Sequence, residues 1–304
     1  MDLRHLRYFV AVAEEKNFTR AAERLCIAQP PLSRQIQQLE EELGVALFEK
    51  GARPVRMTDA GKFFYAHAQK LLGKAADLKS MTQRVGKIER NLSIGFVAST
   101  LYGMLPKIIR QFRMQYNDIA ITLHEMTSLD QIKALKEGRI DVGFGRIKHE
   151  DPNIRRIVLR EERMVVALPP EHPLAGSTAP LRLQDLISER LIIFPIAPRP
   201  SFSDQVIGVF TEIGLYPESM VEVREVHVAI GLVAAGEGIA IVPASVQGMR
   251  RTDMQYMDIQ EKHAVSPVIF STRMLDKSEE LTNLLHLIYD IYAAENIVYV
   301  REAL

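Results

Sequence analysis

Two stripes of apolar residues at helical spacing mark the first 44 residues of the chain. Their members recur every three or four positions, and they are Leu3, Leu6, Phe9, Val10 and Ala13, then Leu32, Ile36, Leu39 and Leu43. A shorter helix is expected between them over residues 20–25, with Thr19 as its N-cap. The pattern predicts short helices with a turn at residues 26–28, the last helix ending at Gly44.

The last of these helices begins with polar side chains that can donate hydrogen bonds. Gln29, Pro30, Ser33 and Arg34 lie in its first two turns, where a proline is tolerated because its missing N–H is not needed. A helix that reads DNA needs donors near its N-terminus, since arginine suits guanine and glutamine suits adenine. The pattern favours a helix-turn-helix, and the alternative is the solvated face of an ordinary helical bundle.

A hairpin and a long helix are expected next. The apolar stretches 45–48 and 55–58 flank a basic tip, which indicates a wing whose Arg53 enters a minor groove or touches phosphate. After Thr58, spacings of four and three alternate through Phe64, Ala68, Leu71, Ala75, Leu78, Thr82 and Val85. Such a heptad seam predicts a paired helix, and packing onto its own domain is the alternative.

Beyond residue 88, apolar strands alternate with amphipathic helices. Strands are expected at 92–97, 119–124, 140–144, 164–168, 191–194, 220–223, 239–242 and 265–270, and helices at 101–116, 130–137, 203–213, 226–235 and 279–293. This alternation predicts an α/β domain of parallel strands joined by crossover helices.

The formal charge of the 304 residues is zero, but the charges are unevenly distributed. Residues 1–87 carry 15 basic and 10 acidic side chains, whereas residues 88–304 carry 23 basic and 28 acidic ones. A basic first part beside an acidic remainder indicates two functions in two domains, and the zero total does not exclude a nucleic-acid partner.

Composition and motifs exclude several classes of protein. No run of about 18 apolar residues predicts a membrane span, and the first residues do not resemble a secretory signal. The single Cys26 can form no intrachain disulfide or cysteine metal cluster, so a reducing cytoplasm is expected. Enzyme motifs are missing and the eight histidines are scattered, so we expect neither catalysis nor a cofactor or metal.

The N-terminal motifs resemble those of the LysR-type transcriptional regulators. They are Arg20-Ala-Ala-Glu-Arg-Leu, Gln29-Pro-Pro-Leu-Ser-Arg-Gln-Ile, Leu39-Glu-x-x-Leu-Gly, Leu47-Phe and Thr58-x-Ala-Gly, and Gly236-Glu-Gly-Ile-Ala-Ile-Val-Pro extends the resemblance across the chain. Segments 4–9, 26–36, 134–146 and 231–238 are similar to the CatM/BenM group, which controls aromatic-compound catabolism. Ala28, where many members have serine, leaves the reading helix without a side-chain N-cap.

The resemblance implies a fold of three parts. These are a winged helix-turn-helix over residues 1–58, a dimerising linker helix over 59–88, and an effector domain over 89–304. The effector domain would be like a periplasmic binding protein, with one α/β subdomain over 89–161 and 268–304 and another over 162–267.

The resemblance also implies a function. The chain would be a cytoplasmic regulator, mainly an activator, that binds double-stranded operator DNA as a dimer of dimers and works with RNA polymerase. Its effector would be a small carboxylate such as muconate or benzoate. A solute-binding protein or an enzyme on the same effector fold is the alternative.

Three helix starts in the expected effector domain carry hydroxyl groups. They include Ser99 with Thr100, Ser128, and Ser201 beside Phe202. Helix N-termini hold anions through unpaired N–H groups, and strand ends in open α/β sheets converge on a crevice. We predict a carboxylate site here, with Phe202 against an unsaturated chain and Arg146 as either a ligand partner or an ion-pair residue. Each hydroxyl alone would more often be a helix cap.

Overall fold

The computed structural model describes residues 1–52, 54–86 and 90–304, without the side chains of residues 76, 77, 79–81 and 83–86. The chain divides into two compact units, Met1–Gly86 and Lys87–Leu304. Arg53 of the expected wing and the Val85 side chain of the expected seam lie outside the described residues.

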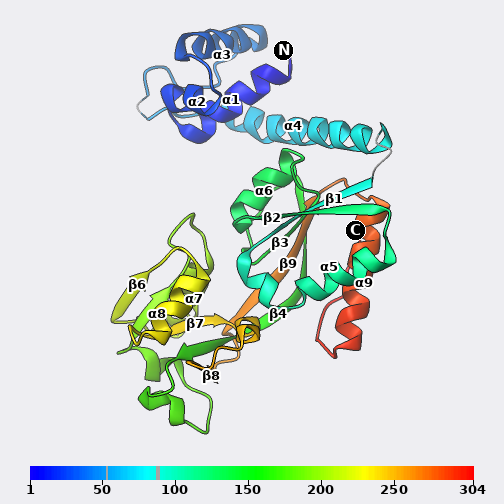
Figure 1. Cartoon of the computed structure of the whole chain (residues 1–304). Helices are drawn as coiled ribbons and strands as arrows, with labels where there is room; N and C mark the ends of the chain where they lie inside the picture. Colours follow the sequence, from blue (N-terminus) through cyan, green and yellow to red (C-terminus); the bar gives the residue numbers. More distant parts are fainter. Residues whose placement is uncertain (53, 87–89) are drawn as a thin grey trace. The chain divides into compact units, whose positions relative to one another are not determined.

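The first unit is helical, as the apolar periodicity predicts. Its helices are α1 (Leu3–Glu15), α2 (Phe18–Arg24), α3 (Gln29–Leu43) and α4 (Asp59–Gly86) (Figure 1). The N-cap residue of α3 is Ala28, which makes no side-chain cap, and its C-cap is Gly44, whose φ of 69° is left-handed. Both features of α3 agree with the expectation from the sequence.

The predicted cap of α2 was wrong. Asn17 is the N-cap, and its side-chain oxygen accepts from the backbone N–H groups of Thr19 and Arg20 at 2.8 and 3.2 Å. The helix begins two residues earlier than expected, at Phe18, which packs partly buried against the core of the unit. Thr19 therefore lies inside the first turn, where it receives the cap instead of providing it.

The core of the first unit joins the two apolar stripes to the segments that follow. Phe9 of α1, Leu32 and Leu39 of α3 and Leu47 are almost fully buried. The Phe9 ring lies 5.1 Å from that of Phe48 and 5.0 Å from that of Phe64, measured between centroids. The expected wing is reduced to one antiparallel bridge between Phe48 and Met57. Wing and α4 are thus both anchored on α1.

The heptad seam of α4 is only partly covered by its own unit. Ala68 is buried, but the side chains of Leu71 and Leu78 are 48% and 67% exposed. Apolar seam positions that stay exposed are the pattern expected of a helix that pairs with a second copy.

The second unit is an α/β structure of two lobes (Figure 1). Its strands are β1 (Arg90–Phe96), β2 (Ile119–Glu125), β3 (Val142–Gly145), β4 (Ile154–Leu168), β5 (Arg190–Ile193), β6 (Ser219–Glu222), β7 (Ala240–Pro243), β8 (Gln255–Asp258) and β9 (Val265–Arg273). Its α-helices are α5 (Leu105–Gln115), α6 (Ser128–Lys136), α7 (Phe202–Thr211), α8 (Val226–Ala234) and α9 (Glu279–Ala294), with short 3₁₀ helices at η1 (Ala98–Tyr102), η2 (Pro173–Gly176), η3 (Leu183–Leu186) and η4 (Ala244–Met249).

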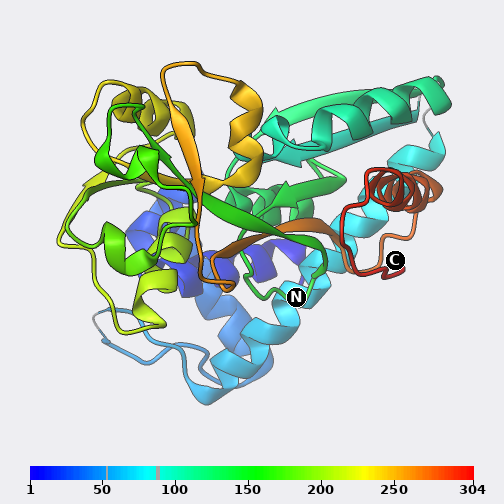
Figure 2. The ribbon, with the colours of Figure 1, turned by 90° about the horizontal axis from the view of Figure 1, so that it is seen from below.

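The sheets are not wholly parallel, which corrects the expectation from the alternating pattern. The larger sheet has the order β2-β1-β3-β9-β4-β7, with β8 on β4, and β5 pairs with β6. Strands β1, β2 and β3 are parallel to one another, but β9 is antiparallel to both β3 and β4. Strand β4 leads from one lobe into the other and β9 returns, so the two run in opposite directions (Figures 1 and 2).

Each lobe has its own apolar core, and β4 contributes to both. Ile157 and Leu159 belong to the core that includes Phe112, Phe270 and Tyr289. The later residues Met164–Leu168 belong to the core of the other lobe. The crossing strands thus connect two separately packed bodies, and a cleft between the lobes can exist without exposing either core.

Candidate functional site

The polar side chains at the start of α3 lie on the outside of the first unit. Gln29, Pro30 and Arg34 are exposed and Ser33 is half-buried, while Leu32 on the opposite face is buried. The Gln29 amide nitrogen donates to the Ser33 hydroxyl oxygen at 2.8 Å. The helix therefore presents these four predicted residues together, with its apolar face anchored in the core.

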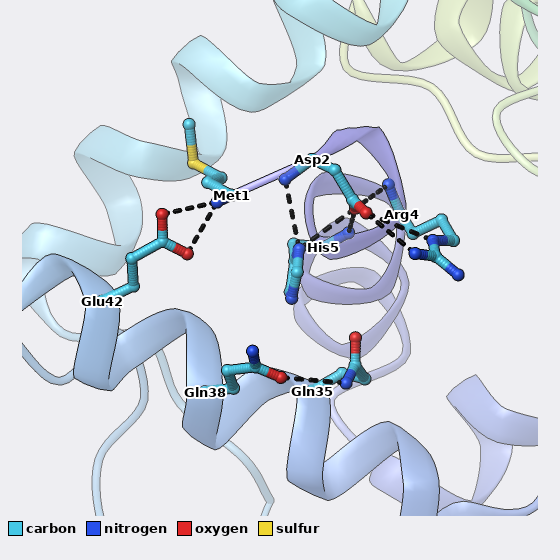
Figure 3. A network of polar contacts seen from close by, with 7 residues as sticks. All are labelled: Met1, Asp2, Arg4, His5, Gln35, Gln38 and Glu42. Atoms are coloured by element: carbon cyan, nitrogen blue, oxygen red, sulfur yellow. Dashed lines mark hydrogen bonds and ion pairs between the residues drawn. The ribbon is translucent and has the colours of Figure 1, made fainter.

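The rest of α3 is fixed by polar contacts with other segments. The N-terminal ammonium group of Met1 pairs with the Glu42 carboxylate at 2.5 and 2.7 Å, and Asp2 caps α1 (Figure 3). The Glu40 carboxylate accepts from the backbone N–H groups of Leu47 and Phe48. Helix α3 is thus held by its later turns, which leaves its first turns free to face a partner.

In the second unit, a cavity of about 1230 Å³ is lined by segments from both lobes. Five of the six residues predicted for an effector line it, namely Ser99, Ser128, Arg146, Ser201 and Phe202. Thr100 does not line this cavity, and its hydroxyl donates to the carbonyl of Val97 at 2.7 Å. We call Ser99, Ser128 and Arg146 the first wall of the cavity, and Ser201 with Phe202 the second wall.

Arg146 organises the first wall. Its Nε donates to the Ser99 hydroxyl oxygen at 2.8 Å, and its backbone N–H donates to the Ser128 hydroxyl oxygen at 3.0 Å. A hydroxyl that accepts in this way still has its own hydrogen to donate. Arg146 is only 3% exposed, and its Nη1 has no hydrogen-bond partner among the described residues. The first wall thus offers hydrogen-bond donors to an anion.

A buried carboxylate balances part of the arginine charge. Glu162 accepts from Arg146 Nη2 at 2.7 Å and from the Ser245 backbone N–H at 2.6 Å, and it lies 3.5 Å from Arg160. Burial works to raise the pKa of Glu162, but attraction to the two arginines outweighs it and holds that pKa below the ordinary value. Burial lowers the pKa of Arg146, and attraction to Glu162 opposes the shift. Two arginines therefore face one carboxylate, which leaves positive charge near the first wall.

The second wall is more apolar than the sequence suggested. The Ser201 hydroxyl donates to the carbonyl of Pro195 at 3.1 Å, so its hydrogen is already used. The Asp204 carboxylate accepts from the Ser201 backbone N–H at 2.6 Å. The Phe202 ring lies 5.2 Å from the Phe194 ring, measured between centroids. This wall suits a carbon skeleton, with the first-turn amides of α7 beside it.

Helix α6, which carries Ser128, is placed by residues that the sequence analysis missed. The side-chain amide of Gln131 donates to the carbonyls of Met126 and Phe144 at 3.3 and 3.1 Å. A Cβ atom at Gly143 would lie 2.6 Å from Gln131 Oε1, so glycine is needed for this close approach. A Cβ atom at Gly145 would lie 3.0 Å from the Ser128 hydroxyl oxygen, so both glycines let α6 pack close to β3.

Glu162 was also missed, although the sequence carries a signal for it. Residues 160–163 are four consecutive charged residues inside the strand β4, whose later residues 164–168 are all buried and apolar. Charges inside such a strand require partners when they are buried. Arg146 lies 16 residues before Glu162, so the sequence alone does not show that these two side chains pair.

Across residues 1–52, 54–86 and 90–304, no group of three or more His, Cys, Asp or Glu side chains is placed to hold a metal ion. Over the same part of the chain, no helix has both the length and the apolar character to cross a bilayer.

Comparison with known families identifies both units. Residues 3–62 match the bacterial regulatory helix-turn-helix of the lysR family, and residues 86–286 match the LysR substrate binding domain. The chain belongs to the LysR family of transcriptional regulators. It is therefore a DNA-binding regulator and not an enzyme, as predicted, and these matches give no support to the solute-binding alternative.

Individual relatives extend over almost the whole chain. The regulator BenM of Acinetobacter baylyi is 49% identical over 97% of each chain, and CatR of Pseudomonas putida is 48% identical over 95% of this chain and 98% of that one. The crystal structure of full-length BenM matches with a TM-score of 0.68 at 48% identity, covering 99% of this chain and 100% of that one.

Two solved structures show ligands on relatives. The BenM effector binding domain with its effector benzoate matches with a TM-score of 0.68 at 42% identity, over 72% of this chain and 99% of that one. Full-length CbnR in complex with its target DNA matches with a TM-score of 0.62 at 31% identity, over 95% and 99%. The expected architecture of a helix-turn-helix joined to a two-lobed effector domain is confirmed.

Proposed function

We propose that the cavity of the second unit binds a small carboxylate of the benzoate or muconate type, and that this effector controls regulation of aromatic-compound catabolism. The observation that carries the proposal is the first wall. Two serine hydroxyls there accept from Arg146 and keep their own hydrogens to donate, beside a buried guanidinium nitrogen without a partner. The benzoate-bound relative supports the same ligand class.

In this proposal the carboxylate accepts from the Ser99 and Ser128 hydroxyls, and the buried guanidinium of Arg146 supplies positive charge behind them. Charge-assisted bonds of this kind are about twice as strong as neutral ones. Phe202 contacts the carbon skeleton, and a second carboxylate would meet the α7 amides after Ser201, whose own N–H is bonded to Asp204. Thr100 supports the 3₁₀ turn that carries Ser99, since its hydroxyl is bonded to Val97.

On the DNA side, Gln29, Pro30, Ser33 and Arg34 are proposed to lie in the major groove. Because Gln29 donates to Ser33, the pair keeps the acceptor Gln29 Oε1 and two donors, the second Gln29 Nε2 hydrogen and the Ser33 hydroxyl hydrogen. Adenine presents a donor at N6 and an acceptor at N7 in that groove, so the pair is complementary to adenine. Arg34 would read guanine, and Arg53 on the wing would contact phosphate or the minor groove.

The remaining parts of the proposal concern assembly and location. Exposed Leu71 and Leu78 on α4 support pairing of two linker helices over residues 59–88, and two such dimers would form the tetramer that recruits RNA polymerase in the cytoplasm. Within the effector domain we propose subdomains over 89–161 with 268–304 and over 162–267. Effector binding would change the spacing of the tetramer on its operator and the bend of the DNA.

A thermal-shift titration tests the ligand class. Benzoate and cis,cis-muconate should raise the melting temperature of the full chain, since a ligand at 100 times its Kd stabilises the folded state by about 2.7 kcal/mol. Benzyl alcohol, which lacks the carboxylate, is the matched control and should have no effect. Ser99→Ala should lose the shift, whereas the exposed Ser219→Ala should keep it. Equal shifts with acid and alcohol would refute a carboxylate site.

Footprinting and DNA-bending measurements test whether effector binding changes how the protein binds DNA. DNase footprints and bend angles on an upstream operator fragment should change when a saturating acid is added. Ser99→Ala should bind the same fragment with wild-type affinity and show no change on adding the acid. Identical footprints with and without the acid in the wild type would refute the coupling but not the carboxylate site.

A further inference from the structure

The two walls of the cavity are joined by a side chain that does not line it. Gln205 lies on α7, one turn after the second-wall residue Ser201, and its amide nitrogen donates to the backbone carbonyl of Arg146 at 2.6 Å. Its amide oxygen accepts from the hydroxyl of Ser266 on β9 at 2.7 Å. Neither Gln205 nor Ser266 is among the residues that surround the cavity.

The chemistry of this contact fixes the orientation of the amide group. A backbone carbonyl can only accept, so the nitrogen of Gln205 must face Arg146. Its oxygen then faces Ser266, which must donate. Ser266 is fully buried, and a buried amide held at both ends has one favourable orientation.

The first wall is also linked to the 3₁₀ helix η4, which belongs to neither wall. Arg146 Nη2 lies 3.5 Å from the Ser245 hydroxyl, and the Glu162 carboxylate accepts from Arg146 Nη2 at 2.7 Å and from the Ser245 backbone N–H at 2.6 Å. The Gln205 bond differs from these links because it starts on α7, the helix that carries the second wall. It also ends on the residue that bonds Ser99 and Ser128, so a shift of α7 is transmitted to all three first-wall residues.

We propose that Gln205 is a positioning residue that sets the separation of the two walls, and through it the preference of the cavity for carboxylates that reach both walls over those that reach one. This inference rests on the proposed carboxylate site. A ligand with a carboxylate at each end must satisfy the first wall and the start of α7 together, so its binding depends on the separation. A ligand with one carboxylate can bind the first wall alone, so its binding depends on that separation less.

The first test needs no ligand. Amide hydrogen exchange of the full chain reports on the segments 144–148 and 201–207. Gln205→Met keeps the length of the side chain but not its hydrogen bonds. Both segments should then exchange at least about threefold faster, because the two walls are no longer held together by Gln205. Gln205→Glu keeps the acceptor for Ser266 but cannot donate, and should act in the same way. Gln260→Met, at an exposed glutamine, is the matched control and should change neither segment. Unchanged exchange in both Gln205 variants would overturn the inference.

The second test measures selectivity by isothermal titration with cis,cis-muconate and benzoate as probes. Gln205→Met should weaken muconate binding about tenfold and benzoate binding less than twofold, and Ser266→Ala should shift the ratio in the same direction by a smaller factor. A structural defect alone would weaken both acids equally, and that result would overturn the inference. If the wild type bound neither acid, the proposed function would fail, and the hydrogen-exchange result would still decide whether Gln205 couples the walls.

Discussion

The reading face of α3 and the first wall of the cavity are built in opposite ways. Gln29, Ser33 and Arg34 lie within six positions of one helix, and their side chains lie on its solvent side. Ser99, Ser128 and Arg146 come from three distant segments, and all are buried. The polar face of α3 needs only a helix whose apolar face is packed in a core, whereas the first wall needs the tertiary fold of the second unit. Substitutions on α3 should therefore change function without stability, and substitutions in the first wall should change both.

The largest effect is expected for Arg146→Ala. Removing one partner of a buried ion pair leaves Glu162 with less compensation, which costs about 3–5 kcal/mol of unfolding free energy. Carboxylate binding should be lost as well. Urea unfolding of the full chain followed by circular dichroism, together with titration calorimetry, checks both. Arg251→Ala, which breaks an exposed pair with Asp253, should cost less than about 1 kcal/mol. Similar losses of unfolding free energy in the two variants would mean that the first wall contributes no more to stability than an exposed ion pair.

Glu162→Gln should cost less, about 2 kcal/mol near pH 7, because the amide can still accept a hydrogen bond from Arg146. The pKa of Glu162 lies below the ordinary glutamate value of 4.5, so its stabilisation is fully present above about pH 4.5 and is lost as pH falls through the lowered pKa. The stability gap between wild type and Glu162→Gln should thus be constant from pH 5 to 8 and narrow on further acidification. Urea melts across this range check the sign, and a gap that widens in acid would contradict it.

Arg34→Ala tests the exposed face of α3, where function should change without a change in stability. If Arg34 makes a bidentate base contact, its loss should cost about 1–3 kcal/mol of discrimination between operator and scrambled DNA. The unfolding free energy should change by less than about 0.5 kcal/mol, since the side chain is exposed. Fluorescence anisotropy at fixed salt measures the discrimination, and an unchanged value would remove Arg34 from the base-reading set.

The smallest effect concerns the cap of α2. Asn17→Ala should cost about 1 kcal/mol, because two backbone N–H groups lose their acceptor. Thr19→Ala is the matched control and should cost less than half as much, since Thr19 does not cap. Chemical denaturation of the full chain measures both. Equal costs would favour the cap that was expected from the sequence.

The missed features of the molecule have two causes. The cap of α2 was a local choice between Asn17 and Thr19, since both residue types cap helices. The antiparallel course of β9 depends on a strand that crosses between lobes. Gln131 and Gln205 are ordinary polar residues on helices until their distant carbonyl partners are known. None of these partners lies within reach of a periodic pattern, so local spacing could not reveal them.

By itself, the sequence determined the helices of the first unit, the exposed reading face of α3, the helix start at Ser128 and the family. These follow from residues a few positions apart, where backbone geometry fixes which side chains share a face. Only the tertiary structure decided that Arg146 bonds Ser99 and Ser128 at once, that the Ser201 hydroxyl is already occupied, and that Gln205 joins the two walls. Such contacts join residues up to 59 positions apart, and their hydrogen-bond directions exist only after the chain has folded.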